Sequence, residues 1–168
     1  QRHVRVCGHF PSGLQHRSVA PPSPSTNEQM TPSSTESTGA TGAAYTLDNT
    51  AFPRVKITLR GAMALRDAEA MTAAIQERVF ARKTAYTLMV DATHAGVPGA
   101  DVRRHFADFS TQNRAHTKRY CKGEAYVMPN ALVRGALTAV MWLSPFEHPH
   151  KVFGTINEAR AWLDGQGA

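Results

Sequence analysis

The chain has 168 residues, of which 42% are hydrophobic, enough for one domain with a sizeable core. Nineteen Lys and Arg against thirteen Asp and Glu give a formal net charge of +6, which favours acidic partners but is also a common way to remain soluble. No apolar run reaches the ~18–20 residues of a membrane span, and the first thirty residues lack the apolar core of a signal peptide. The two isolated cysteines, Cys7 and Cys121, fit a reducing compartment, so we expect a cytoplasmic protein.

Residues 1–44 differ in composition from the rest of the chain. They are rich in Ser, Thr, Pro and Gly from about residue 18 onward and show no periodicity, which predicts a disordered leader. Met30 is a natural initiator, so we expect residues 1–29 to lie outside the working protein. One folded domain is expected over residues 45–168.

The regular pattern begins with two short predicted strands, residues 45–49 and 54–61, separated by a turn that contains Pro53. The second strand alternates apolar residues with cations and threonine, which places Val55, Ile57 and Leu59 on one face and suits a position near a sheet edge. Three further strands are then predicted to alternate with four helices, in the order helix 65–82, strand 85–92, helix 100–120, strand 124–129, helix 131–143, strand 150–154 and helix 155–163.

This alternation over short connections predicts right-handed crossovers. The expected fold is therefore α/β, with a mixed, largely parallel sheet of about five strands, an antiparallel N-terminal edge strand and about four covering helices.

The stretch "NALVRGALTAVMWLSP", residues 130–145, has almost no polar side. A helix that is apolar all round is buried, or is half buried in its own domain and half in a partner. The four-residue spacing of Ala131, Gly135 and Ala139 predicts close approach to a neighbouring element. We interpret the helix as a packing element first.

Four segments together resemble the SpoIIAA-like fold of STAS domains, and more narrowly the small bacterial STAS-like proteins of unknown role: "FPRVKITLRG", "YTLMVDAT", "YVMPNALVRGALTAVMWLSP" and "HPHKVFGTINEARAWL". The resemblance covers residues 45–164, and the fold is also shared loosely by CRAL–TRIO-type lipid-binding domains. It implies a non-enzymatic binding module. STAS anti-sigma antagonists are switched by a phosphorylated serine where a helix follows a central strand. Here no serine lies between Asp91 and Ser110, so a switch would have to use Thr93.

The carboxyl ends of parallel strands are the usual ligand site of such a sheet. A small anionic or lipid ligand could be held there by the amide groups that begin two helices, with candidate ligand-binding residues Asp91, Thr93, His94, Asn130, Arg134 and Thr155. The alternative is that Asn130 and Thr155 only cap helices, as most such residues do, and that Arg134 pairs with an acidic neighbour such as Asp91.

Metal, cofactor and nucleic-acid binding are each less well supported. His148 and His150 would point the same way on an extended chain, with His94 as a third ligand, but a surface turn explains the pair, so we expect no metal site and no cofactor. Residues 101–122 hold six Lys and Arg, yet no recognition motif or aromatic platform accompanies them. A solvated helix face is the usual meaning of such a run, which argues against nucleic acid.

The function that the sequence favours is a regulatory module that acts through protein–protein contact, including self-association. The candidate interaction surface comprises Trp142, Pro145, Phe146, Arg103 and Arg104. A small-molecule or lipid-binding domain is the second hypothesis. A hydrolase using Asp91 and His94 is the third, although no nucleophile-elbow sequence or glycine-rich phosphate loop supports it.

Overall fold

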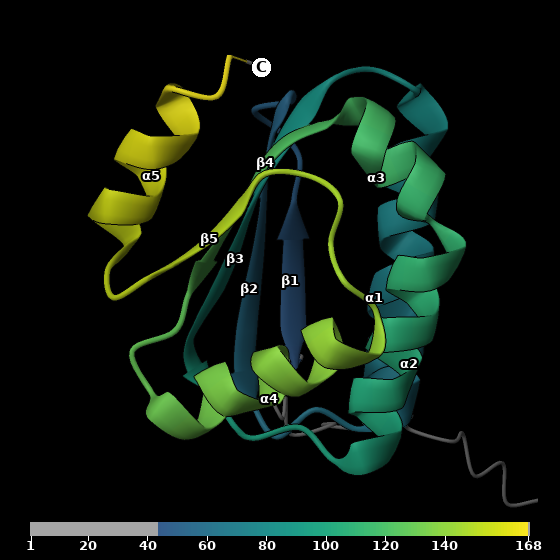
Figure 1. Ribbon diagram of the computed structural model, residues 1–168, viewed down its shortest axis with the longest axis vertical. Coiled ribbons are helices and arrows are strands. Elements are labelled where there is room, and N and C mark those ends of the chain that lie inside the picture. Colours follow the sequence, from purple (N-terminus) through teal and green to yellow (C-terminus); the bar gives the residue numbers. More distant parts are fainter. Residues whose placement is uncertain (1–43, 168) are drawn as a thin grey trace, which may run out of the picture. The chain divides into compact units, whose positions relative to one another are not determined.

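The computed structural model describes residues 44–167 (Figure 1). The predicted disordered leader lies outside the described residues except for its last residue, Ala44. The suggested start at Met30 and Cys7 also lie outside them. Within them, five strands and five α-helices follow one another, in the predicted order but with one more helix than the sequence predicts. The strands are β1 (Tyr45–Asp48), β2 (Arg54–Gly61), β3 (Tyr86–Ala95), β4 (Cys121–Val127) and β5 (His150–Phe153). The helices are α1 (Leu65–Arg78), α2 (Ala100–Gln112), α3 (Arg114–Tyr120), α4 (Ala131–Leu143) and α5 (Ile156–Asp164), with a short 3-10 helix at Phe80–Arg82.

The five strands form one sheet in sequence order, β1-β2-β3-β4-β5. β1 is antiparallel to β2, and every later neighbour is parallel. The predicted mixed sheet with an antiparallel N-terminal edge strand is therefore confirmed. β2 lies next to that edge, and its alternation holds, with Val55 and Ile57 buried and Arg54 exposed.

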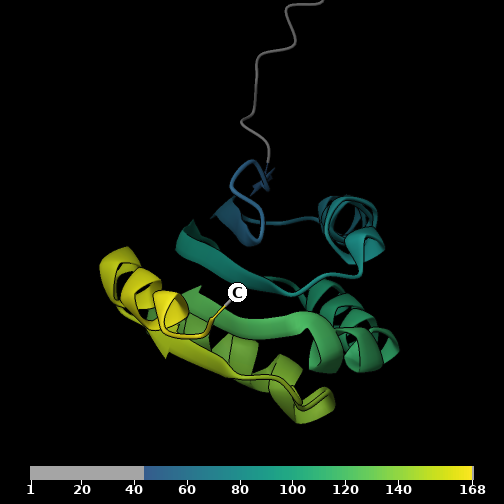
Figure 2. The same cartoon turned by 90° about the horizontal axis from the view of Figure 1, so that it is seen from above.

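Helices cover both faces of the sheet (Figure 2). α5 packs alone on one face, where Met89, Ala125 and Val127 form a small core with Ala159 and Leu163. α1, α2 and α4 lie on the other face, over the larger core built from alternate residues of β2, β3 and β4. Because successive strand residues point to opposite faces, even-numbered residues of β4 such as Glu124 and Tyr126 face the larger helix layer.

Several predicted boundaries are wrong, including that of β4, which begins at Cys121 rather than at residue 124. The first helix ends at Arg78 rather than Arg82, and a 3-10 turn follows. The predicted helix 100–120 breaks at Asn113 into α2 and α3, so the helices number five rather than four. β3 continues to Ala95, which places Thr93 and His94 inside a strand instead of the following loop.

The prediction for α4 is half correct. Val133, Ala136 and Val140 are buried against the domain, as expected for a packing helix. Gly135 is exposed, and a Cβ placed on it would meet no atom within 4 Å. The close approach that the spacing of Ala131, Gly135 and Ala139 predicts therefore does not occur at Gly135 within residues 44–167.

No helix in the described part of the chain combines the length and the apolar character needed to cross a membrane.

Candidate functional site

Two of the residues predicted at the strand ends act as helix caps. The side chain of Asn130 accepts a hydrogen bond from the Leu132 amide at 2.8 Å, at the start of α4. Thr155 and Glu158 form a reciprocal capping box at the start of α5, with each side chain bonded to the other's backbone amide. These polar groups therefore satisfy the first turns of their own helices.

Arg134 also serves local structure. Its guanidinium donates to the backbone carbonyls of Met128 and Pro129 at 2.8 and 2.9 Å. It thereby ties the first turn of α4 to the end of β4, and within the described residues it forms no ion pair with Asp91, whose partner is Lys56. The ligand role of Arg134 stays a prediction.

Asp91 lies on the α5 face of the sheet, where its ion partner is Lys56 at 3.2 Å and its hydrogen-bond donor is the Thr93 hydroxyl at 2.7 Å. Burial raises the pKa of this carboxyl, but the hydrogen bonds from Thr93 and the contact with Lys56 outweigh burial and leave the pKa below its ordinary value. His94 is exposed and pairs in register with Arg60. Asp91 is thus engaged by Lys56 and Thr93, and no hydrogen bond joins it to His94 among the described residues.

The predicted interaction surface divides into exposed and packed parts. Trp142 is 83% exposed, and Pro145 is exposed as well. Phe146 instead turns inward, where its ring stacks on Tyr126 and His148. On α2, Arg104 is exposed, whereas Arg103 donates to the Pro98 carbonyl at 2.8 Å.

A cavity of about 180 Å³ lies between the sheet and the layer of α1, α2 and α4. Its walls are almost entirely apolar, and they include Ile57, Leu88, Val90, Phe106, Phe109 and Leu137. It is not a pocket confined to the carboxyl ends of the strands, where the sequence predicted a ligand, because its lining extends to Tyr86 at the start of β3.

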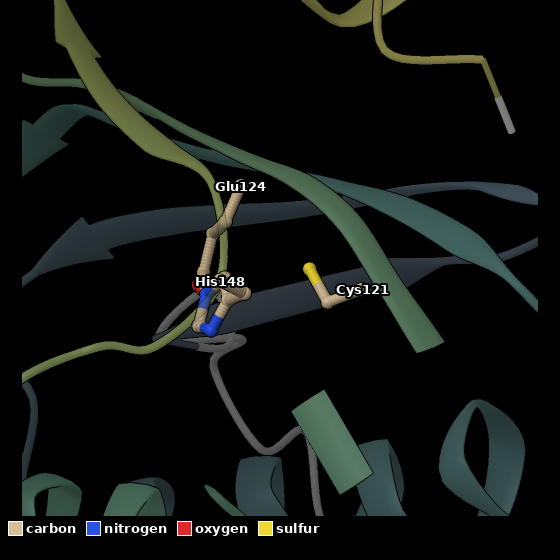
Figure 3. Close-up of side chains that lie close together, drawn as sticks. All are labelled: Cys121, Glu124 and His148. Atoms are coloured by element: carbon tan, nitrogen blue, oxygen red, sulfur yellow. The ribbon is translucent and has the colours of Figure 1, made fainter. Parts of the chain in front are cut away.

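A polar cluster borders this apolar cavity. Glu124 projects from β4, accepts a hydrogen bond from the Tyr126 hydroxyl at 2.6 Å and lies 2.5 Å from Nε2 of His148. Figure 3 shows the imidazole of His148 against the Glu124 carboxylate, with the Cys121 thiol close by. Burial, reinforced by the negative charge of Glu124, raises the pKa of Tyr126 and the pKa of the Cys121 thiol well above their ordinary values. Both groups are therefore neutral at physiological pH.

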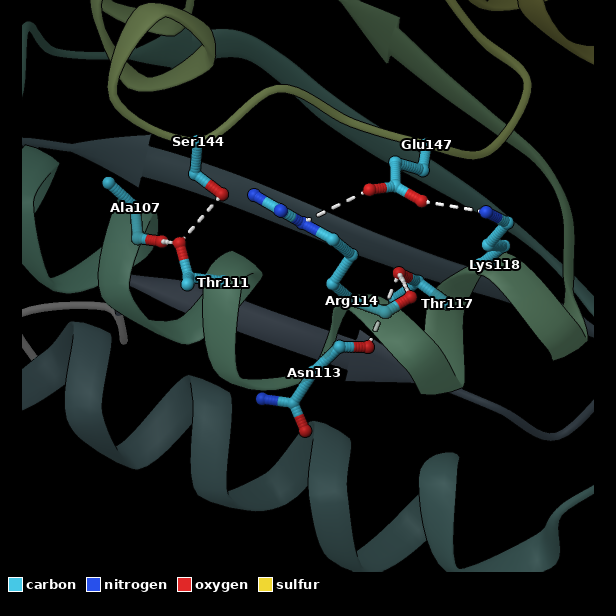
Figure 4. A network of polar contacts seen from close by, with 8 residues as sticks. All are labelled: Ala107, Thr111, Asn113, Arg114, Thr117, Lys118, Ser144 and Glu147. Atoms are coloured by element: carbon cyan, nitrogen blue, oxygen red, sulfur yellow. Dashed lines mark hydrogen bonds and ion pairs between the residues drawn. The ribbon is translucent and has the colours of Figure 1, made fainter.

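The connection that carries Phe146 and His148 is fixed to the helix layer by polar contacts (Figure 4). The hydroxyl of Ser144, which is fully buried, lies 2.9 Å from the Thr111 hydroxyl on α2. Glu147 bridges Lys118 at 2.9 Å and Arg114 at 3.6 Å on α3. Two of the six cations of the basic segment 101–122 are thereby paired within the domain.

Cys121, Glu124 and His148 also offer three possible metal-ligating atoms within 4.8 Å of one another. This group differs from the three histidines that the sequence analysis considers as metal ligands, His148, His150 and His94. His94 lies elsewhere, and Nδ1 of His150 lies 3.0 Å from the His148 carbonyl. The Glu124 carboxylate and Nε2 of the His148 imidazole are already bonded to each other.

Comparison with known proteins fits this architecture. The sequence profile described as SpoIIAA-like matches residues 54–164, about two thirds of the chain. The chain belongs to the SpoIIAA-like family. The resemblance inferred from the four sequence segments is therefore confirmed.

Solved structures with SpoIIAA-like architecture are similar to this chain at low sequence identity. An uncharacterized DUF3478-family protein with a SpoIIAA-like fold, from Shewanella loihica, is 17% identical, with a TM-score of 0.53 over 71% of this chain and 92% of that chain. An anti-sigma factor antagonist from Mycobacterium paratuberculosis is 15% identical, with a TM-score of 0.47 over the same shares. None of the curated proteins compared with the chain matches it significantly.

Within this SpoIIAA-like domain, sequence reasoning missed Glu124 and Tyr126 and assigned His148 to a surface turn. A signal was present, because Glu124 is the one charged residue in the otherwise apolar segment 124–129. A charge on a buried strand requires a partner. The partner, His148, is 24 residues away in sequence and could not be named without the β4–β5 pairing.

Proposed function

We propose that this SpoIIAA-like domain is a non-enzymatic regulatory module that acts through protein–protein contact, with α4 as the contact element. The observation that carries the proposal is the exposure of large apolar side chains on one helix. Leu132, Trp142 and Leu143 are 71%, 83% and 65% exposed. Three such side chains on one short helix form the kind of apolar surface that marks an interaction site.

The exposed half of α4 is suited to a second copy of this chain. Its large apolar residues flank the exposed small residues Ala131 and Gly135, and helical spacing places all of them within one half of the circumference. Arg134, the one charged residue of α4, is held by backbone carbonyls of its own chain. The same uncharged face on two copies of a basic protein can therefore meet without opposing charges, as a two-fold symmetric contact requires.

Analytical ultracentrifugation over a concentration series tests the proposal. The wild-type chain is expected to self-associate, and Trp142→Ala is expected to weaken association at least tenfold, as loss of a central interface tryptophan does. Val97, a 49% exposed residue that is not on α4, provides the control, because Val97→Ala removes apolar surface without touching the helix.

Circular dichroism spectra of the variants should match that of the wild type, since neither side chain is buried. A wild-type chain that stays monomeric at high concentration, or association that Trp142→Ala leaves unchanged, would count against the proposed contact.

A further inference from the structure

The cavity over the larger sheet face has the size and chemistry of a small-ligand site. An engineered apolar cavity of about 150 Å³ in another protein stays dry and binds benzene, and the cavity here has about 180 Å³. The cavity is partly open rather than sealed, so a small molecule can enter it. Walls such as Leu88, Phe106 and Phe109 favour a ring-sized apolar occupant.

One polar atom at this cavity lacks a partner. His148 lines the cavity and is 7% exposed, and its Nδ1 atom is buried without a hydrogen-bond partner among residues 44–167. The other ring nitrogen, Nε2, faces Glu124 (Figure 3). An unsatisfied buried nitrogen costs roughly 1–3 kcal/mol, and a ligand with a matching group would recover part of that cost.

The contacts of Glu124 determine which group would match. An ionised carboxylate can only accept hydrogen bonds, and Glu124 accepts from the Tyr126 hydroxyl on one oxygen and from Nε2–H of His148 on the other. In the tautomer that carries its proton on Nε2, the imidazole of His148 has a lone pair at Nδ1. A ligand group that donates a hydrogen bond matches Nδ1 in this tautomer, and the negative charge of Glu124 nearby disfavours an anionic head group.

We propose that this cavity binds a small, ring-sized apolar molecule with one neutral hydroxyl group, which donates its hydrogen bond to Nδ1 of His148. The site is separate from the exposed face of α4, because Ala136 and Leu137 reach the cavity from the buried half of that helix. Failure of ligand binding would leave the proposed self-association unaffected, and the reverse also holds.

Isothermal titration of the full chain with phenol and toluene tests this recognition, because the two probes share a ring and differ in the hydroxyl group. We expect phenol to bind about tenfold more tightly than toluene, since toluene leaves Nδ1 unpaired. Benzoate is expected to bind more weakly than phenol. Equal affinities for phenol and toluene, or tighter binding of benzoate, would overturn the proposal.

His148→Phe removes the acceptor and keeps an aromatic ring of similar size. It is expected to abolish the preference for phenol while toluene binding persists, and His94→Phe, a change at an exposed histidine, is the matched control. His148→Phe also leaves the Glu124 carboxylate without its imidazole partner. Nitrogen-15 NMR of the wild-type imidazole therefore provides a second measurement. Phenol should shift the Nδ1 resonance, whereas toluene should leave it in place; an unchanged Nδ1 resonance with phenol bound contradicts the assignment.

Zinc titration separates this site from a metal centre. Stoichiometric Zn²⁺ binding that is lost in both His148→Phe and Cys121→Ser would make the imidazole a metal ligand and overturn the proposed hydroxyl acceptor. Absence of stoichiometric binding agrees with a cluster in which Glu124 and His148 are already each other's partner.

Discussion

His116 is a single residue whose environment predicts how the stability of the domain depends on pH. Its ring stacks on Phe80 at 4.2 Å, and its Nε2 atom is buried without a partner among the described residues. Burial, together with the positive charge of Lys83, lowers the pKa of His116 from its ordinary value of 6.5. The unfolded chain therefore binds this proton more readily than the folded chain, and stability falls as pH drops through 6.5 towards the lower, folded-state pKa.

His116→Phe should remove this part of the pH dependence, because phenylalanine keeps the stacking on Phe80 and carries no proton. Urea unfolding at about pH 7.5 and about pH 5 measures the effect. The expected result is a smaller loss of unfolding free energy in the variant than in the wild type. His94→Ala removes an exposed imidazole as the control, and an equal loss in wild type and His116→Phe would contradict the assignment.

The sequence predicts residue roles well where the partner is local. The sequence predicts Asn130 and Thr155 as possible caps because a cap and its amide lie two or three residues apart. The cluster of Glu124, Tyr126 and His148 could not be found in the same way. It depends on the register of β4 with β5, in which Glu124 lies opposite His150, and register is a property of the folded sheet.

Among the elements, α5 depends on its N-terminal cap, because it is only nine residues long and covers one sheet face alone. Short helices gain little from propensity alone. Thr155→Ala removes the oxygen that bonds the Glu158 amide, so we expect the free energy of unfolding to fall by about 1 kcal/mol. Thermal or urea unfolding measures this, and Thr155→Ser should retain most of the stability.

Unfolding in the presence of phosphate distinguishes two roles of Thr155: a helix cap and the anion-binding residue that the sequence also predicts. Because the Thr155 hydroxyl and amide are both engaged with Glu158, we expect phosphate to leave the difference between wild type and Thr155→Ala unchanged. A phosphate-dependent stabilisation that appears only in the wild type would instead support the ligand role of Thr155.

The helix boundaries that the sequence missed share a physical cause. The spacing of apolar residues indicates which residues are buried, and residues beyond the end of a helix can still be buried. Val79 keeps the stripe of α1 and is 2% exposed, yet it lies beyond the last helical residue, Arg78. At Asn113 the side chain bonds the Phe109 carbonyl at 2.8 Å, and such local competition with the backbone favours a break that periodicity cannot reveal.

At the scale of the whole molecule, the two sheet faces are packed differently. The α5 face is closed at Ala125, which is fully buried, and its own pocket, beside Lys56 and Arg160, is lined by charged as well as apolar residues. The opposite face holds the almost entirely apolar cavity over β2, β3 and β4. The alternation of strands and helices was sufficient to predict the SpoIIAA-like fold. Whether the layers meet without a gap depends on side-chain volumes from elements far apart in sequence, so the cavity could not be predicted.

Filling the cavity separates the two proposed activities in one molecule. Ala136 lies on the buried half of α4 and lines the cavity, so Ala136→Leu adds apolar volume where space exists and should raise the free energy of unfolding by about 1 kcal/mol. The same change should abolish phenol binding and leave self-association intact, because Trp142 is untouched. Ala125→Leu is the matched control at a fully buried position that lines neither pocket, where overpacking is expected to cost about 1–3 kcal/mol. Urea unfolding, titration and sedimentation of both variants provide the comparison. Equal destabilisation by the two substitutions would mean that the space beside Ala136 does not accept a ligand-sized group.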